Sequence, residues 1–195
     1  MGLGRTTKES QIPVDPFPVV RLFVHWMEQV DDDLSALLLD AEMRSMGHVS
    51  WTRRAHTHGD GLPMMVHSGD IQNAPARASE FIDVSLAALA KAGVAYVGTS
   101  PISFCGKKFG SFPCFAGWRR RDAQRSGELF EPASVRARLD IASGGTGHLP
   151  LVPACTADRW WPQIWSTAEV GGAPSRAMRR SGRHLRLRCR SQSGT

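Results

Sequence analysis

Short apolar runs, each bounded by turn-forming residues, recur along the chain from residue 19 to residue 152. The first, 19–27, combines β-branched and aromatic residues without Gly or Pro, which is typical of a strand partly buried on both faces. Similar runs, which we interpret as further strands, lie at 48–52, 64–67, 80–84, 94–98, 115–118, 135–141 and 148–152. Many short strands separated by turn signals predict a mostly β fold, a sandwich or a barrel.

Two segments show other patterns. Residues 85–93 are rich in alanine and leucine and end in Gly93, which predicts one short helix with a C-terminal glycine cap. Residues 34–39 fit helical spacing and strand alternation equally well, because Leu34 and Leu38 belong to both patterns. Periodicity therefore does not decide between a helix and a strand for this segment.

The pattern divides the chain into three parts. Residues 1–18 are polar and then punctuated by proline, which indicates an N-terminal extension ahead of a domain formed by 19–152. Residues 153–195 show neither the helical nor the strand periodicity of apolar residues, and they combine Trp, Gly and Pro with an Arg-rich end. We interpret this Arg- and Trp-rich segment as a disordered tail. The abrupt loss of acids and of periodicity leaves a non-native, out-of-frame ending as an open hypothesis.

The formal net charge of +6 comes from the C-terminal part of the chain. Residues 1–140 contain 16 Lys and Arg and 16 Asp and Glu, whereas residues 141–195 contain 8 Arg and only two acids. A neutral body argues against a basic nucleic-acid-binding face on the folded domain. The Arg-rich end could contact phosphates, but it lacks interleaved aromatic residues for base stacking, so nucleic-acid association is a weaker alternative.

Composition places the chain among soluble globular proteins. The hydrophobic content of 42% with 22% charged residues is close to the globular average, which excludes a wholly disordered chain. No apolar run reaches the ~18 to 20 residues that a transmembrane helix needs, and the N-terminal residues lack the apolar segment of a secretory signal. We therefore expect a cytoplasmic protein.

A set of acidic residues is the first candidate for chemistry. Three adjacent aspartates, Asp31 to Asp33, repel one another, so the run is either solvated or neutralised by a cation. In an extended conformation Asp31 and Asp33 point to the same side of the chain and could chelate a hard cation together with Asp70 and Glu80. The alternative is a solvated acidic turn. The spacing is not that of an EF-hand.

A second candidate is the pattern His56-x-His58-x-Asp60, which matches the first part of the zinc signature of metallo-β-lactamase-type hydrolases. Two imidazoles spaced two apart can bind one zinc ion and the aspartate a second, with His67 as a further ligand. Gly61 stands where the signature has its last histidine, so a polar loop is the alternative. Phosphate-binding loops and nucleophile elbows do not occur, and we expect a protein that is not an enzyme.

A series of short blocks resembles the TerD-like domain of tellurium-resistance and stress-response proteins. The blocks follow the family's order and are 21–26 (RLFVHW), 30–40 (VDDDLSALLLD), 66–70 (VHSGD), 78–83 (ASEFID), 92–96 (AGVAY) and 115–117 (FAG). The resemblance covers 19–152, roughly two-thirds of the chain. It implies a bacterial stress-response protein, a β-sandwich that binds calcium through acidic loops. It also favours a strand at 34–39, so we expect an antiparallel β-sandwich with one short helix and a disordered C-terminal tail.

Carried over residue by residue, the resemblance implies Ca²⁺ ligands at Asp31, Asp33, Asp70 and Glu80. These acids would lie at one end of the sandwich and order loops that contact a protein partner. Residues 71–79, commonly rich in Gly and Asp in the family, contain Arg77 and no acid. Because Ca²⁺ takes six to eight oxygen ligands, a degenerate site stays open as an alternative. Asp32, where relatives often have an apolar residue, is expected to be either a compensating ligand or exposed.

The leading hypothesis is therefore a non-enzymatic calcium-binding or interaction module. A zinc-dependent hydrolase that uses His56, His58 and Asp60 is the alternative from a different class. Metal identity separates the two hypotheses, since oxygen-only ligands favour calcium while imidazoles favour zinc.

Overall fold

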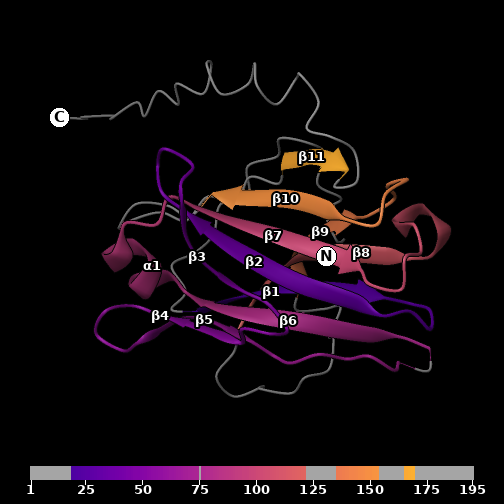
Figure 1. The fold of residues 1–195 in the computed structure, drawn as a ribbon, viewed down its shortest axis with the longest axis horizontal. Helices are drawn as coiled ribbons and strands as arrows, with labels where there is room; N and C mark the ends of the chain where they lie inside the picture. Colours follow the sequence, from indigo (N-terminus) through magenta and orange to yellow (C-terminus); the bar gives the residue numbers. More distant parts are fainter. Residues whose placement is uncertain (1–18, 75, 122–134, 154–164, 170–195) are drawn as a thin grey trace.

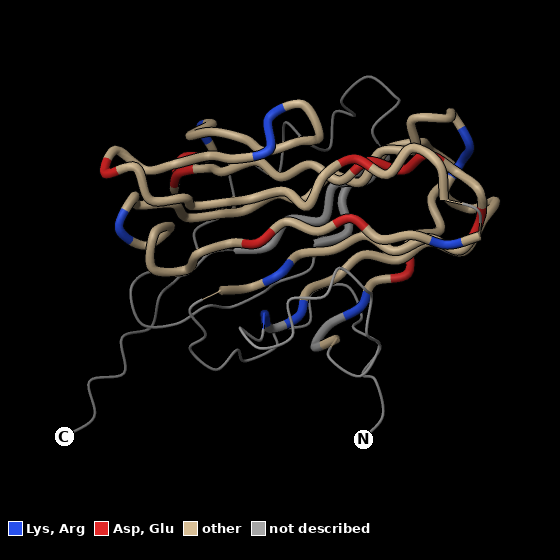
Figure 2. Tube along the Cα trace, turned by 90° about the horizontal axis from the view of Figure 1, so that it is seen from below, with Lys and Arg blue, Asp and Glu red and all other residues tan. Residues whose placement is uncertain are grey.

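The computed structural model describes residues 19–74, 76–121, 135–153 and 165–169. Within these ranges the chain is mostly β and forms two antiparallel sheets that pack face to face (Figure 1). Figure 2 shows the two layers edge-on, with positively and negatively charged positions on both. The antiparallel β-sandwich expected from the sequence is confirmed.

The larger sheet has six strands. In spatial order they are β4 (Ala55–Thr57), β5 (Pro63–His67), β6 (Ala78–Ser85), β1 (Val19–Trp26), β8 (Cys114–Arg120) and β9 (Val135–Asp140). The second sheet has five, in the order β11 (Trp165–Glu169), β10 (His148–Pro153), β7 (Tyr96–Ser103), β2 (Asp32–Leu39) and β3 (Ser45–Val49). The segment at 34–39 is thus a strand, which resolves the ambiguity of its sequence pattern.

Strand β1 is buried on both faces, as its composition predicts. Its inward-facing side chains, which enter the main core between the sheets, are Val20, Leu22, Val24 and Trp26. Phe23 points to the opposite face and forms a separate buried cluster with Phe81, Phe115 and Val135. The outer face of the six-stranded sheet therefore carries an aromatic cluster of its own.

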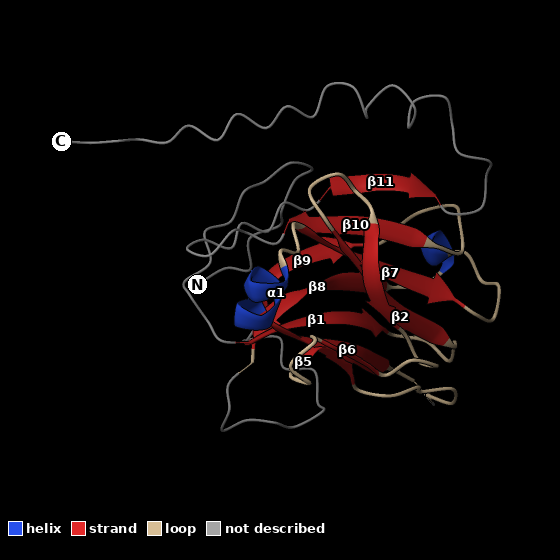
Figure 3. Cartoon of the chain, turned by 60° about the vertical axis from the view of Figure 1, so that its left-hand side comes forward, coloured by secondary structure: helices blue, strands red, loops and turns tan. Residues whose placement is uncertain are grey.

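A short α-helix lies at one end of the sandwich, which confirms the predicted helix (Figure 3). It is α1 (Leu86–Ala92), and the Ser85 hydroxyl accepts a hydrogen bond from the backbone N–H of Ala88 in its first turn. Gly93 ends the helix with a φ of 72°, a left-handed conformation that disfavours residues with a Cβ. No described helix is long and apolar enough to cross a membrane.

The loops after β1, β5 and β7 lie at the other end of the sandwich, away from α1 (Figure 1). The register of the strands places them there, since Trp26 is opposite Ala78 in one sheet and Asp32 is opposite Ser103 in the other. The loop after β7 contains a short 3₁₀ helix, η1 (Phe109–Ser111). All of the acids predicted as ligands lie at this end.

Three elements differ from the sequence-based expectation. The strand predicted at 48–52 is β3, which ends at Val49, because Ser50 and Arg53 exchange backbone hydrogen bonds and form a turn. The polar loop around His56 contains the short edge strand β4. The five-stranded sheet continues into the expected disordered tail, where Trp165–Glu169 form β11. The extension 1–18 and the rest of 153–195, apart from Pro153 in β10, lie outside the described residues.

Candidate functional site

Three carboxylates from two segments of the chain converge at the loop end of the sandwich. Asp31 precedes β2, Asp33 lies on β2, and Asp70 lies in the loop that follows β5. Each offers an oxygen atom, and the three oxygens lie within 4.8 Å of one another. Asp33 is buried, whereas Asp31 and Asp70 are half-buried, so the group of three, called here the acidic triad, is accessible from solvent on one side. The triad contains three of the four residues that the sequence predicts as calcium ligands.

Strand alternation decides which of the adjacent aspartates joins the triad. Asp31 and Asp33 project to one side of β2, and Asp32 projects to the other, into the core face with Leu34. Asp32 is fully buried, and among the described residues neither of its carboxylate oxygens has a hydrogen-bond partner. Burial raises the pKa of Asp32 to about 7, against the opposing effect of the Ser103 side chain. The expectation that Asp32 is a compensating ligand or exposed is wrong.

Glu80, the fourth predicted ligand, has a different set of partners. Its carboxylate is buried, and Oε2 accepts a hydrogen bond from the backbone N–H of Leu34 at 2.7 Å. Oε1 accepts a hydrogen bond from the backbone N–H of Ile71 at 3.1 Å. Leu34 follows Asp33 and Ile71 follows Asp70, so Glu80 holds the two segments that carry these triad members. The structure does not place Glu80 within the triad itself.

The edge of β2 is open at this point, which explains why side chains bind there. Strand β3 pairs with β2 only from Ala36 onward, so the backbone groups of Leu34 on that side have no strand partner. His67 Nε2 donates to the Leu34 carbonyl at 2.8 Å, and His67 Nδ1 accepts from the Gly69 backbone N–H at 2.9 Å. Both ring nitrogens are thereby used, and these partners require the neutral tautomer with its proton on Nε2. His67 is therefore a structural residue here.

The triad concentrates negative charge. Burial, followed by the negative charges of Glu80, Asp31 and Asp70, raises the pKa of Asp33 to about 7. Burial and the charges of Asp70 and Glu80 also raise the pKa of Asp31. Charged carboxylates this close repel one another unless a proton or a cation lies between them.

The chemistry of the donors points to a hard cation. All three triad members present carboxylate oxygens, and within the described residues they form the one group of three or more His, Cys, Asp or Glu side chains with metal-ligand spacing. Oxygen-only sites suit Ca²⁺, Mg²⁺ or Mn²⁺, whereas zinc sites are built from imidazole and thiolate. Up to six carboxylate oxygens are available, which lies within the range of calcium coordination.

The second predicted cluster is not brought together in this way. His56 lies on β4 with its ring against the backbone of Gly47 and near the guanidinium of Arg53. Asp60 forms an ion pair with Lys91 at 2.5 Å and accepts a hydrogen bond from the Leu62 backbone N–H. Among the described residues His56, His58 and Asp60 do not form a ligand group, and the zinc alternative stays a prediction.

Sequence reasoning did not identify the supporting roles of His67 and Glu80. The two residues are separated from Leu34 by 33 and 46 positions, and their contacts with it depend on how the two sheets pack. A signal for Asp32 was present, because continuing the alternation of Leu38, Ala36 and Leu34 by one step places Asp32 on the core face.

Comparison with known proteins supports the fold. No protein-family model matches the chain, and no curated protein matches it. Among solved structures, the chain is similar to the crystal structure of SAV2460, a protein of unknown function, with a TM-score of 0.54 and 17% sequence identity. The similarity covers 85% of this chain and 97% of that one. At this identity the likeness indicates a shared fold and carries no functional argument.

Proposed function

We propose that the chain is a calcium-binding module that acts without catalysis, with Asp31, Asp33 and Asp70 as the protein ligands. The observation that carries the proposal is the convergence of three carboxylate oxygens within 4.8 Å. Burial and mutual repulsion raise the pKa values of Asp31 and Asp33, and a divalent cation between the carboxylates would remove the repulsion. Glu80 is a positioning residue in this proposal, because its carboxylate is engaged by two backbone N–H groups.

Binding of the cation would order the loops that contain Asp31 and Asp70. Asp31 and Asp70 lie in loops that follow different strands, and a shared cation would fix their relative positions. Loops at the end of a rigid sandwich commonly form binding surfaces. We propose that the calcium-loaded loops contact a protein partner. Tellurium-resistance or stress-response activity in the bacterial cytoplasm is part of the proposal on the strength of the TerD-like sequence blocks alone.

Calorimetric titration of the whole chain with Ca²⁺ and, in parallel, with Zn²⁺ tests this function. We expect one Ca²⁺ per chain and an increase in melting temperature with Ca²⁺, since a ligand that binds only the folded state stabilises it. Asp70→Asn should abolish both effects. Glu28→Gln is the matched control, because Glu28 pairs with Lys107 in the neighbouring loop.

Absence of calcium binding in the folded wild-type chain would contradict the proposal, as would equal binding by Asp70→Asn. Zinc binding that is lost in His56→Ala, without any response to calcium, would replace the proposal by the zinc hypothesis. The melting temperature of each variant in EDTA establishes that it folds, so a loss of binding is attributable to the missing ligand.

A further inference from the structure

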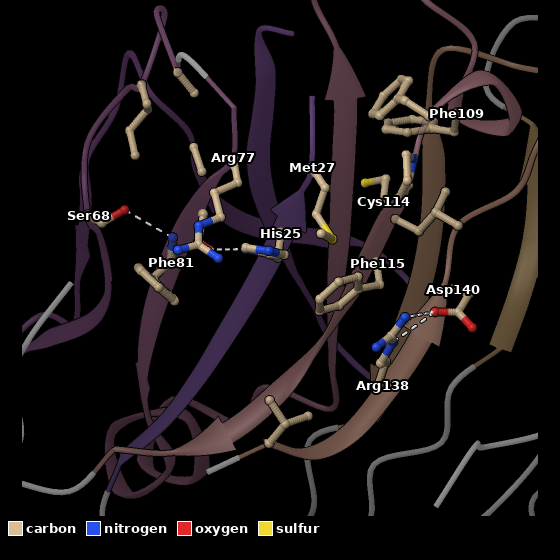
Figure 4. A pocket seen from close by; sticks show the side chains of 18 of the residues that line it. His25, Met27, Ser68, Arg77, Phe81, Phe109, Cys114, Phe115, Arg138 and Asp140 are labelled. Carbon is tan, nitrogen blue, oxygen red and sulfur yellow. Dashed lines mark hydrogen bonds and ion pairs between the residues drawn. The ribbon is translucent and has the colours of Figure 1, made fainter. Parts of the chain in front are cut away.

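A pocket of about 1080 Å³ on the outer face of the six-stranded sheet adjoins the acidic triad, because Asp70 belongs to both (Figure 4). The loops after β5 and β7 form its walls at the loop end of the sandwich. Its floor contains Phe81, His25 and Phe115, which are only 2%, 7% and 6% exposed. Guanidinium groups lie over the rings of Phe81 and Phe115. A ligand of this pocket therefore meets charged groups rather than open ring faces.

The lining of this pocket, called here the outer-face pocket, has an excess of positive charge. Its charged residues are Arg54, Arg77, Arg138, Asp70 and Asp140. Arg138 pairs with Asp140 at 2.6 Å, and Asp70 is a ligand of the cation in the proposed function. Arg54 and Arg77 are exposed, and neither forms an ion pair with a described residue. Two guanidinium groups are therefore available to carboxylates, which they bind through paired hydrogen bonds.

Both of these guanidinium groups lie close to features already described. The guanidinium carbon of Arg54 is 3.7 Å from the position that a Cβ of Gly69 would take, so Arg54 is next to the residue that precedes Asp70. Arg77 lies beside His25 in Figure 4. An anion that contacts Arg54 is thus close to the acidic triad, and one that contacts Arg77 is within the pocket.

The protonation of His25 agrees with a positive field inside the pocket. Burial, followed by the positive charges of Arg77 and Arg138, lowers the pKa of His25 to about 4. Charges that oppose a proton on the imidazole favour an anion at the same place. Met27 adds an apolar contact to the lining, since its side chain is 51% exposed and methionine adapts to partners of different shape.

Shape and charge together favour an acidic peptide as the occupant. A bilayer does not enter a concave pocket, and surfaces that bind anionic lipids usually cluster about four to eight basic residues. A free phosphate would fill a small part of the volume. A peptide with acidic side chains around an apolar one can contact both guanidinium groups and Met27 at once, and arginine clusters commonly recognise acidic motifs.

Calcium would control the approach of such a peptide. Without a cation, the negative charge of the triad lies beside Arg54 and repels an acidic chain. Within the triad, Asp33 is 3% exposed and its carboxylate has no hydrogen-bond partner among the described residues, so it needs a proton or a cation. A bound Ca²⁺ would cancel most of the negative charge and leave the positive field of the pocket.

We propose that the outer-face pocket binds an acidic peptide segment of a protein partner when calcium occupies the acidic triad. Carboxylates of the segment pair with Arg54 and Arg77, and an apolar side chain packs on Met27. This inference rests on the proposed function, because calcium is what removes the repulsion. It adds the chemistry of the partner and the surface that the partner contacts.

Selection of a randomised nonapeptide library on phage, against the immobilised whole chain in Ca²⁺ and in EDTA, identifies such segments. We expect Ca²⁺ to enrich peptides with Asp and Glu around an apolar residue. The most enriched peptide, synthesised with a fluorescein label, should bind about tenfold more tightly in Ca²⁺ than in EDTA, measured by fluorescence anisotropy.

Substitutions in the pocket should weaken binding of this labelled peptide. Arg54→Gln and Arg77→Gln should each lower the affinity about tenfold, since each removes a charge-assisted hydrogen bond. Arg44→Gln is the matched control, because Arg44 is exposed and lies outside the pocket. Met27→Ser should also weaken binding, whereas Leu62→Ser, at a position 59% exposed outside the pocket, should not. The melting temperature of each variant verifies that it folds.

Calorimetric titration of the same preparations with Ca²⁺ separates the two proposals. A chain that binds no Ca²⁺ contradicts the proposed function, whatever the selection yields. If Ca²⁺ binds, the peptide proposal is overturned by equal binding in EDTA, by enriched peptides without acids, or by an affinity that neither arginine substitution changes. Calcium-dependent binding to phosphatidylserine vesicles, without any enriched peptide, would overturn it in favour of a membrane surface.

Discussion

The Oε2 atom of Glu80 accepts a hydrogen bond from the backbone N–H of Leu34 at 2.7 Å, across 46 positions of the sequence. Through its other oxygen the same carboxylate binds the backbone N–H of Ile71. One buried acid thus connects the β2 segment with Asp33 to the loop with Asp70. The separation of Asp33 and Asp70 is therefore controlled from within the core, by a residue of the six-stranded sheet, which faces the sheet that contains β2.

Glu80→Gln tests this connection. The side-chain amide keeps one acceptor oxygen but turns its NH₂ group toward the second backbone N–H, so one hydrogen bond to a charged group is lost without compensation. We expect the free energy of unfolding to fall by about 2 kcal/mol, measured by urea denaturation, and calcium affinity to fall with it. Glu42→Gln is the control, because Glu42 is exposed and pairs only with Arg44 at the surface. Equal stability of Glu80→Gln and wild type would refute the role of Glu80.

Asp33→Asn should have opposite effects on stability without and with calcium. In EDTA at pH 8 the substitution removes a buried charge from the triad, and we expect an increase in unfolding free energy on the order of 1 kcal/mol. At saturating Ca²⁺ the wild type gains ligand stabilisation that the variant lacks, so the wild type becomes the more stable protein. Thermal melts in the two buffers measure the reversal.

The difference in stability between metal-free wild type and Asp33→Asn should depend on pH. The folded-state pKa of Asp33 is about 7 and its ordinary value is 3.8, so between these values the folded state holds a proton that the unfolded state has lost. Metal-free wild type should therefore lose stability relative to Asp33→Asn as the pH rises from about 4 to about 7. A constant difference across this range would show that Asp33 does not titrate with the expected pKa.

Titration of His25 should change the stability of the protein with pH in the opposite direction. Its folded-state pKa of about 4 lies below the ordinary 6.5, so the unfolded state binds the extra proton in between. The contribution of neutral His25 is complete above pH 6.5 and is lost as the pH falls toward 4. Over that range wild type should lose up to about 3 kcal/mol relative to His25→Gln. His48→Gln, a substitution at an exposed position, is the control, and NMR titration of the ring gives the His25 pKa directly.

Gly47→Ala should destabilise the edge of the five-stranded sheet. Gly47 has a φ of 155°, and a Cβ at this position would lie 2.3 Å from the His56 ring. We expect a loss of about 1 to 3 kcal/mol in unfolding free energy. The double variant with His56→Ala should recover the part that comes from the collision with the ring. Gly59→Ala is the control, since no atom lies within 4 Å of its added Cβ. No loss in Gly47→Ala would mean that β3 rearranges freely.

Local patterns were sufficient to predict most strands and the helix. The alternation of apolar residues and the turn residues between them predict short strands. Gly93 marks the end of the helix because the helix C-cap adopts a left-handed conformation that glycine favours. Three of the four predicted ligands converge, since Asp31 and Asp33 share one side of an extended segment. The two hydrogen bonds of Glu80 depend on sheet packing, which periodicity does not encode.

A crystal structure of the calcium-soaked protein, with anomalous diffraction to locate the metal, tests the central claim most directly. The account predicts one calcium ion bonded to carboxylate oxygens of Asp31, Asp33 and Asp70 at about 2.3 to 2.6 Å, with Glu80 still bound to the backbone of Leu34 and Ile71. A triad without calcium at saturating concentration, or calcium bound elsewhere in the chain, would contradict it.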